Sequence, residues 1–184
     1  RAIPNMMVLS PCDGPEMRLA VKALLDYDGP AYMRLGRLAV DSITDSIPDY
    51  KFELGKGVTI RDGKDVTIVA AGMMVQMAAQ AAELLAGEGI SARVLDFHTI
   101  KPLDEELIIK SAKKTGKVVT AEEHSIIGGL GGAVCEVLSE KAPTPVCRIG
   151  MNDIFGESGS AGALVAKYGL DAEGIYGKVK AFVK

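Results

Sequence analysis

Tryptophan is absent from this chain of 184 residues, aromatic side chains make up only 5%, and there are only three cysteines and two histidines. So few aromatic rings provide no stacking platform for nucleic-acid bases. The formal net charge is −3, so the chain also lacks the basic excess that usually accompanies nucleic-acid binding. We therefore expect no nucleic-acid partner.

The cysteines Cys12, Cys135 and Cys147 are far apart and form no Cys-x-x-Cys pair, and only His98 and His124 could add imidazole ligands. This set predicts neither a zinc site nor a disulfide framework, so no metal site is expected. Free thiols in an otherwise ordinary composition are typical of a reducing compartment. A cytoplasmic location is therefore expected.

Long hydrophobic runs are also lacking. Residues 66–82 carry no charge, but they include Thr67, Gly72 and Gln76 and fall short of the roughly 20 apolar residues that a membrane-spanning helix needs. A strand that ends at Gly72, followed by a buried helix, accounts for this segment better. No membrane partner is expected.

What the sequence does contain is a regular alternation of strand and helix patterns. Hydrophobic residues make up 48% and charged residues 24%, which is typical of a globular protein. We expect strands at residues 66–71, 92–97, 117–121 and 145–149, and helices at residues 73–85, 102–114, 131–141, 160–168 and 172–183. This alternation predicts an α/β fold of three layers, with a mostly parallel sheet of about five strands between helices.

A shorter strand-helix-strand pattern precedes this domain, with strands at residues 5–9 and 31–35. Its helix should begin at an Asp13 cap, because Pro15 in the first turn and Glu16 three residues after the cap are typical of a helix start. Such a small unit is unstable alone, so we expect its open strand edges to pair with another copy or to leave it poorly ordered in isolation. We also expect the chain to begin inside a longer protein.

Residues 38–62 lack a sustained periodicity and are predicted to be a linker with one short strand at residues 58–61.

The richest candidate site follows the predicted strand at residues 117–121. Glu122 and Glu123 beside His124 could perform acid-base chemistry, because nearby negative charge raises the pKa of a histidine. The glycine-rich residues 128–132 could present backbone amides to an anion at the next helix start. A tight turn before a closely packed helix explains the same residues without chemistry. For His98, a hydrogen-bonded residue at a strand end is the simplest interpretation.

Arg34 and Arg37 end a predicted strand beside Gly36. There a planar guanidinium could bind a phosphate through two parallel hydrogen bonds. A solvated surface arginine is the alternative for each.

Several segments, taken in order, resemble one enzyme family. Residues 3–16 and 29–37 resemble the last part of the pyrimidine-binding domain of transketolases and 1-deoxyxylulose-5-phosphate synthases. Residues 63–72 resemble the start of their C-terminal domain, and residues 95–104, 122–129 and 155–170 continue the series over nearly the whole chain. The Phe155-Gly156-Glu157-Ser158 segment favours transketolase. The resemblance divides the chain into residues 1–37 as a remnant of the pyrimidine-binding domain, residues 38–62 as linker, and residues 63–184 as the transketolase C-terminal domain.

The resemblance implies an enzyme of pentose phosphate metabolism that transfers two-carbon ketol units between sugar phosphates, working as a homodimer. Its thiamine diphosphate and Mg²⁺ would be bound by upstream domains or a separate subunit, so we expect no cofactor and no catalytic residue in this chain. Arg37 matches the arginine that binds the sugar phosphate, with Gly36 where the family has serine or proline. Glu123 and His124 are possible secondary site residues. The chain would support dimerisation and domain packing and be inactive alone.

Alternatives from other classes stay open. One is a nucleotide-binding or regulatory α/β module that uses residues 128–132. Another is a structural subunit that docks onto a separately encoded catalytic partner. A third is the corresponding part of a 1-deoxyxylulose-5-phosphate synthase.

Overall fold

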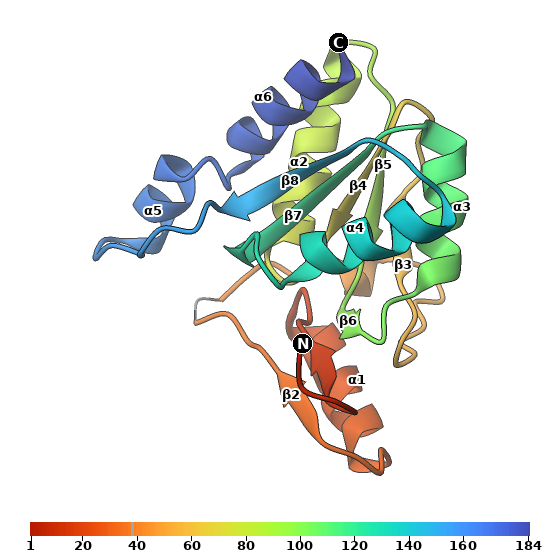
Figure 1. The fold of residues 1–184 in the computed structure, drawn as a ribbon. Coiled ribbons are helices and arrows are strands. Elements are labelled where there is room, and N and C mark those ends of the chain that lie inside the picture. Colours follow the sequence, from red (N-terminus) through yellow and green to blue (C-terminus); the bar gives the residue numbers. More distant parts are fainter. Residues whose placement is uncertain (38) are drawn as a thin grey trace.

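The computed structural model describes residues 1–37 and 39–184 and contains two sheets (Figure 1). The larger sheet has five strands in the order β3-β5-β4-β7-β8, and all of its pairings are parallel except that of β3 with β5. The predicted α/β class with a mostly parallel sheet of about five strands is therefore confirmed. The strands are β3 (Val58–Arg61), β4 (Val66–Ala70), β5 (Ala92–Asp96), β7 (Val118–Ser125) and β8 (Val146–Met151).

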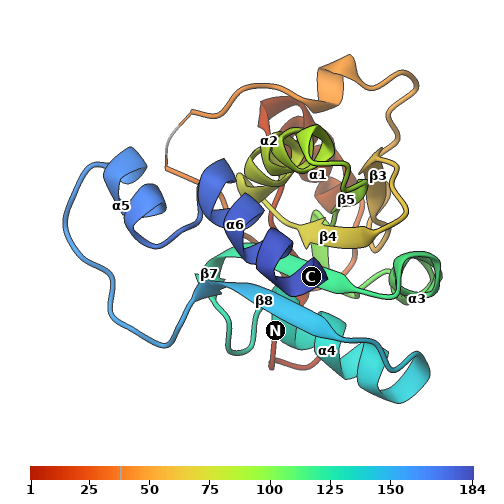
Figure 2. The same ribbon diagram turned by 90° about the horizontal axis from the view of Figure 1, so that it is seen from above.

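Helices cover both faces of the large sheet, which gives three layers (Figure 2). The helices α2 (Met74–Gly87) and α6 (Ala172–Val183) pack on one face, and α3 (Glu105–Thr115) and α4 (Leu130–Lys141) pack on the other. The central strand β4 shows why both faces are apolar. Ile68 packs in the α2 and α6 core while the adjacent Val69 packs in the α3 and α4 core, because successive side chains of a strand point to opposite faces.

Local sequence signals set the ends of the helices. Asp104 caps α3 by accepting a hydrogen bond from the Leu107 amide at 3.1 Å, and Gly116 ends the helix with a positive φ of 70°. Both predicted boundaries are therefore close to the observed ones. The short helix α5 (Ala161–Lys167) has no buried residue. None of the helices in the described ranges is long and apolar enough to cross a membrane.

The smaller sheet joins the N-terminal residues to the rest of the chain. It has the order β2-β1-β6, in which β1 (Met7–Leu9) pairs in parallel with β2 (Ala31–Met33) and antiparallel with β6 (Thr99–Lys101). The strand β6 was not predicted. It gives β1 a second partner within the chain, so the expectation of an open edge that pairs with another copy or stays poorly ordered is wrong for β1. The strand β2 remains at the edge of this sheet.

The connection between the two parts contains more structure than predicted. After α1 (Gly14–Leu25) and β2, residues 38–62 include the short 3₁₀ helix η1 (Thr44–Ser46) and the predicted strand β3. The strand β3 pairs with β5 and is therefore part of the large sheet.

We expect alanine to have opposite effects on stability at two glycines of α6, Gly174 and Gly177. A Cβ at Gly174 would lie 2.5 Å from the Cα atom of Gly169, whereas a Cβ at Gly177 would meet nothing within 4 Å. Gly174→Ala should therefore destabilise the protein by about 1–3 kcal/mol, because the backbone has to shift. Gly177→Ala should stabilise it by about 0.5–1 kcal/mol, because alanine loses less conformational entropy in a helix. Urea unfolding of both variants measures the difference, and equal effects would contradict the close packing of Gly174.

Candidate functional site

The loop after β2 carries the predicted phosphate-binding residue. The loop begins beside the end of β1, where the Arg34 amide donates a hydrogen bond to the Leu9 carbonyl at 2.8 Å. Leu35, Gly36 and Arg37 are exposed. Among the residues that the structure describes, none forms a hydrogen bond or an ion pair with the Arg37 guanidinium, so its donors can bind a ligand. The role of Arg37 in phosphate binding stays a prediction.

A pocket of about 320 Å³ lies next to this loop. Leu35 and Gly36 form one side of the pocket, and residues from the loop before α1, including Cys12 and Asp13, form another. The Asp13 carboxylate is not free to bind a ligand in this pocket. It already accepts hydrogen bonds from the amides of Glu16, Ile43 and Thr44. Burial alone would raise the pKa of Asp13, but these hydrogen bonds together lower it. Asp13 therefore fixes the loop before α1, as its predicted cap role requires.

A second pocket, of about 380 Å³, brings Arg34, Glu123 and His124 together. The Arg34 guanidinium donates a hydrogen bond to the backbone oxygen of Glu123 and lies 3.8 Å from its carboxylate. His124 is exposed, and its Nδ1 atom lies 3.0 Å from the backbone oxygen of Ser125. All three residues belong to one pocket, but Arg34 and Glu123 already form an ion pair that ties the end of β2 to β7.

Glu122 also lines this pocket, but its carboxylate is used within the chain. The strand β7 is longer than predicted and continues to Ser125, so Glu122 lies within it rather than in a loop. The Glu122 side chain is buried, and its carboxylate accepts hydrogen bonds from the amides of Leu130 and Gly131, both at 2.8 Å. Burial raises the pKa of Glu122, while these two hydrogen bonds oppose the rise. The start of α4 is thus occupied by a carboxylate of the chain itself, which removes the geometry that a nucleotide site at residues 128–132 would need.

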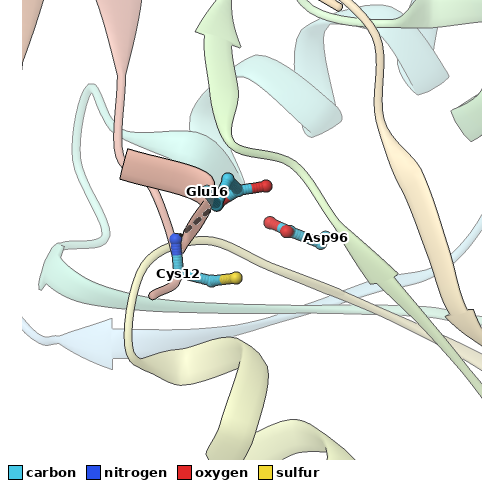
Figure 3. A group of neighbouring side chains, drawn as sticks. All are labelled: Cys12, Glu16 and Asp96. Carbon is cyan, nitrogen blue, oxygen red and sulfur yellow. Dashed lines mark hydrogen bonds between the residues drawn. The ribbon is translucent and has the colours of Figure 1, made fainter. Parts of the chain in front are cut away.

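A third group, of buried acidic and sulfur-containing side chains, lies between the two sheets and was missed in the sequence. One candidate ligand atom from each of Cys12, Glu16 and Asp96 lies within 4.8 Å of the others (Figure 3). The only local signal was Asp96, a buried acidic residue at the end of β5. Nothing in the spacing of the three residues indicated that they meet.

His98 borders this group and is completely buried. Its ring stacks on Phe52 with centroids 4.2 Å apart, and its Nδ1 atom lies 3.0 Å from the Thr99 hydroxyl. The prediction of a hydrogen-bonded residue at a strand end is confirmed. Burial lowers the pKa of His98, and the nearby Glu16 charge acts in the opposite direction.

Comparison with known proteins shows which family the chain belongs to. The family described as transketolase, C-terminal domain, matches residues 55–175. The chain belongs to the transketolase C-terminal domain family. A solved structure with a similar fold is a split-gene transketolase described as an inactive beta4 tetramer, with a TM-score of 0.91 and 50% sequence identity over 98% of this chain and 58% of that one. The transketolase C-terminal fold predicted from the resemblance is therefore confirmed.

Curated relatives of this transketolase C-terminal domain carry transketolase and synthase names. The 6-deoxy-6-sulfo-D-fructose transketolase subunit SqwH of a Clostridium species is 49% identical over 95% of this chain and 54% of its own length. One of the apulose-4-phosphate transketolase subunits of Phocaeicola vulgatus is 47% identical over 100% of this chain and 58% of its own. A 1-deoxy-D-xylulose-5-phosphate synthase of Syntrophotalea carbinolica is 42% identical over 100% of this chain and 29% of its own. The chain thus spans about half the length of the two transketolase subunits.

Proposed function

We propose that this chain is the C-terminal part of a transketolase-type enzyme that transfers two-carbon ketol units between sugar phosphates. The observation that carries the proposal is the placement of Arg37. It is exposed in the loop after β2, beside a pocket, in a chain that belongs to the transketolase C-terminal domain family. A guanidinium placed in this way can bind the phosphate of a sugar with two parallel hydrogen bonds. The similarity to curated relatives named as transketolase subunits favours this function over that of the synthase.

Thiamine diphosphate and Mg²⁺ would be bound by other domains of the enzyme or by a separate subunit. A diphosphate needs cationic side chains or free backbone amides. In the described part of the chain, the start of α4 is occupied by Glu122, and the start of α1 is capped by Asp13. These two helix starts therefore offer no free amides to a diphosphate, and we derive no catalytic step through the cofactor in this chain.

The proposed role of the chain itself is support and assembly. Residues 1–37 would complete a pyrimidine-binding domain, residues 38–62 would connect it, and residues 63–184 would form the C-terminal domain. Two relatives are named as subunits, and the similar solved structure is described as a tetramer, which supports association with partner subunits and with a second copy. Exposed apolar side chains such as Phe155, 96% exposed, would be covered in that assembly. Its cytoplasmic location is likewise a proposal, in keeping with the three free thiols.

Reconstitution tests the proposal. The chain is mixed with the domains or subunit that would bind thiamine diphosphate, and ketol transfer between sugar phosphates is assayed. We expect activity only for the combination, and we expect thiamine diphosphate with Mg²⁺ to raise the melting temperature of the combination but not of the chain alone. Ketol transfer by the isolated chain, or none by a combination that binds the cofactor, would overturn the proposal.

A further inference from the structure

Two carboxyl groups from opposite parts of the fold meet in the interior. Glu16 lies in the first turn of α1 and Asp96 at the end of β5, and both residues are 0% exposed. Figure 3 shows the side chains of Glu16, Asp96 and Cys12 directed toward one another. The pair therefore connects the N-terminal unit to the large sheet.

The two carboxyl groups differ in their hydrogen bonds. Glu16 accepts one hydrogen bond from the Cys12 amide, at 2.6 Å, and one from the Tyr50 hydroxyl. Both carboxyl oxygens of Asp96 are buried without a partner among the described residues. The described residues therefore supply two hydrogen-bond donors to Glu16 and none to Asp96, so Asp96 is the carboxyl group that lacks a hydrogen-bond donor.

The charged groups around Asp96 also favour a protonated Asp96 carboxyl group. The titratable groups that face it are Glu16, Asp13 and Cys12 from the N-terminal unit and Tyr50 from the connection. His98 borders the group, and burial lowers its pKa, which favours the neutral imidazole. None of these groups is therefore a cation. Two ionised carboxylates in a buried site without a cation repel each other strongly, so such a pair retains a proton.

We propose that the Glu16–Asp96 pair is a proton-binding site that joins α1 to the end of β5, with the proton on Asp96 and shared with Glu16. Burial, followed by the charge of Glu16, raises the pKa of Asp96 well above its usual value, in agreement with this assignment. The protonated Asp96 carboxyl group would supply the missing donor, and an oxygen of the Glu16 carboxyl group would accept the hydrogen bond. This inference does not depend on the proposed enzymatic function.

A divalent cation is the alternative ligand for the same residues. It would bind Cys12 as a thiolate, but burial and the neighbouring carboxylates raise the pKa of the Cys12 thiol. Each Glu16 oxygen already accepts a hydrogen bond. The geometry therefore favours the proton over a metal ion, and metal analysis belongs to the test.

The sign of the pH dependence follows from the raised pKa of Asp96. Its contribution to stability is fully present below the pKa of an unfolded aspartate, about 3.9, and is lost as the pH rises through the folded pKa. Within that window the folded state holds one more proton than the unfolded state. The folding equilibrium constant should therefore fall by up to about tenfold for each pH unit.

The test compares two buried aspartates by the same substitution in the intact protein. Asp96→Asn replaces a neutral acid by a neutral amide that can still donate to Glu16, so we expect it to keep neutral-pH stability and to lose the pH dependence assigned to Asp96. Asp13→Asn is the matched control. It removes a carboxylate that accepts three amide hydrogen bonds, so we expect a clear loss of stability. Urea unfolding midpoints between about pH 5 and about pH 9 provide the comparison.

A second measurement reads the proton directly. Carbon-13 NMR of the aspartate carboxyl groups should show Asp96 protonated at neutral pH in the wild-type protein. An ionised Asp96 signal, or an Asp96→Asn loss as large as that of Asp13→Asn, would overturn the proposal. Stoichiometric metal in the purified protein that disappears in Cys12→Ser, but not in the Cys135→Ser control, would overturn it in favour of a metal site.

Discussion

Replacing Arg37 with alanine is expected to lower kcat/KM of the reconstituted enzyme about 10- to 100-fold for phosphorylated sugars and to leave their unphosphorylated analogues nearly unchanged. A hydrogen bond to a charged group contributes about 1.5–3 kcal/mol, which corresponds to roughly 10- to 100-fold in rate. At a site as exposed as Arg37, solvent screening keeps the total effect of its paired donors within this range. Arg37 is exposed and its side chain forms no hydrogen bond or ion pair with the described residues, so its removal should not disturb the fold. Steady-state kinetics with matched pairs of phosphorylated and unphosphorylated substrates measure this selectivity.

Two further arginine variants serve as controls for Arg37. Arg37→Lys retains the charge but loses the planar pair of donors, so it should recover only part of the activity. Arg18→Ala removes another exposed arginine, on α1, and should have no selective effect. An equal loss for phosphorylated and unphosphorylated substrates in Arg37→Ala would exclude the phosphate role.

Glu122→Gln is expected to destabilise the protein by about 2–4 kcal/mol, because the side-chain amide can accept only through its single oxygen. One of the two buried amides at the start of α4, of Leu130 or Gly131, would then face an NH₂ group. The loss of negative charge at a helix start adds to the effect. The free energy of unfolding from urea titration measures the change.

The neighbouring Glu123 provides the matched control for Glu122. Its side chain is 43% exposed, and its closest ion-pair distance to Arg34 is 3.8 Å. Glu123→Gln should therefore change stability by about 1 kcal/mol or less. Similar losses in the two variants would show that the Glu122 carboxylate does not cap α4.

Local patterns predicted most of the fold. The apolar runs of β4 and β5, the Asp104 cap and the Gly116 helix end are signals carried by a few neighbouring residues. Parallel strands buried on both faces have a composition that differs from that of the helices covering them. The fold class and the order of the longer strands and helices could therefore be predicted from spacing alone.

The missed features all depend on contacts between distant segments. The strand β6 has only three residues, too few for a periodic pattern, and it forms because β1 lies beside it. The role of Glu122 as a cap for the start of α4 could be recognised only once the length of β7 was known. The group of Cys12, Glu16 and Asp96 comes from the loop before α1, from α1 and from β5, so no local spacing could reveal it.

The position of β1 between β2 and β6 limits how the molecule can move. Its hydrogen bonds extend to β2 on one side and to β6 on the other, while Arg34 additionally ties the end of β2 to β7. A hinge rotation between the N-terminal unit and the large sheet would have to break the β1–β6 pairing and the hydrogen bond from Arg34 to Glu123 at the same time. We therefore expect the two parts to move together, and any adjustment of Arg37 to a substrate to come from the exposed residues Leu35, Gly36 and Arg37.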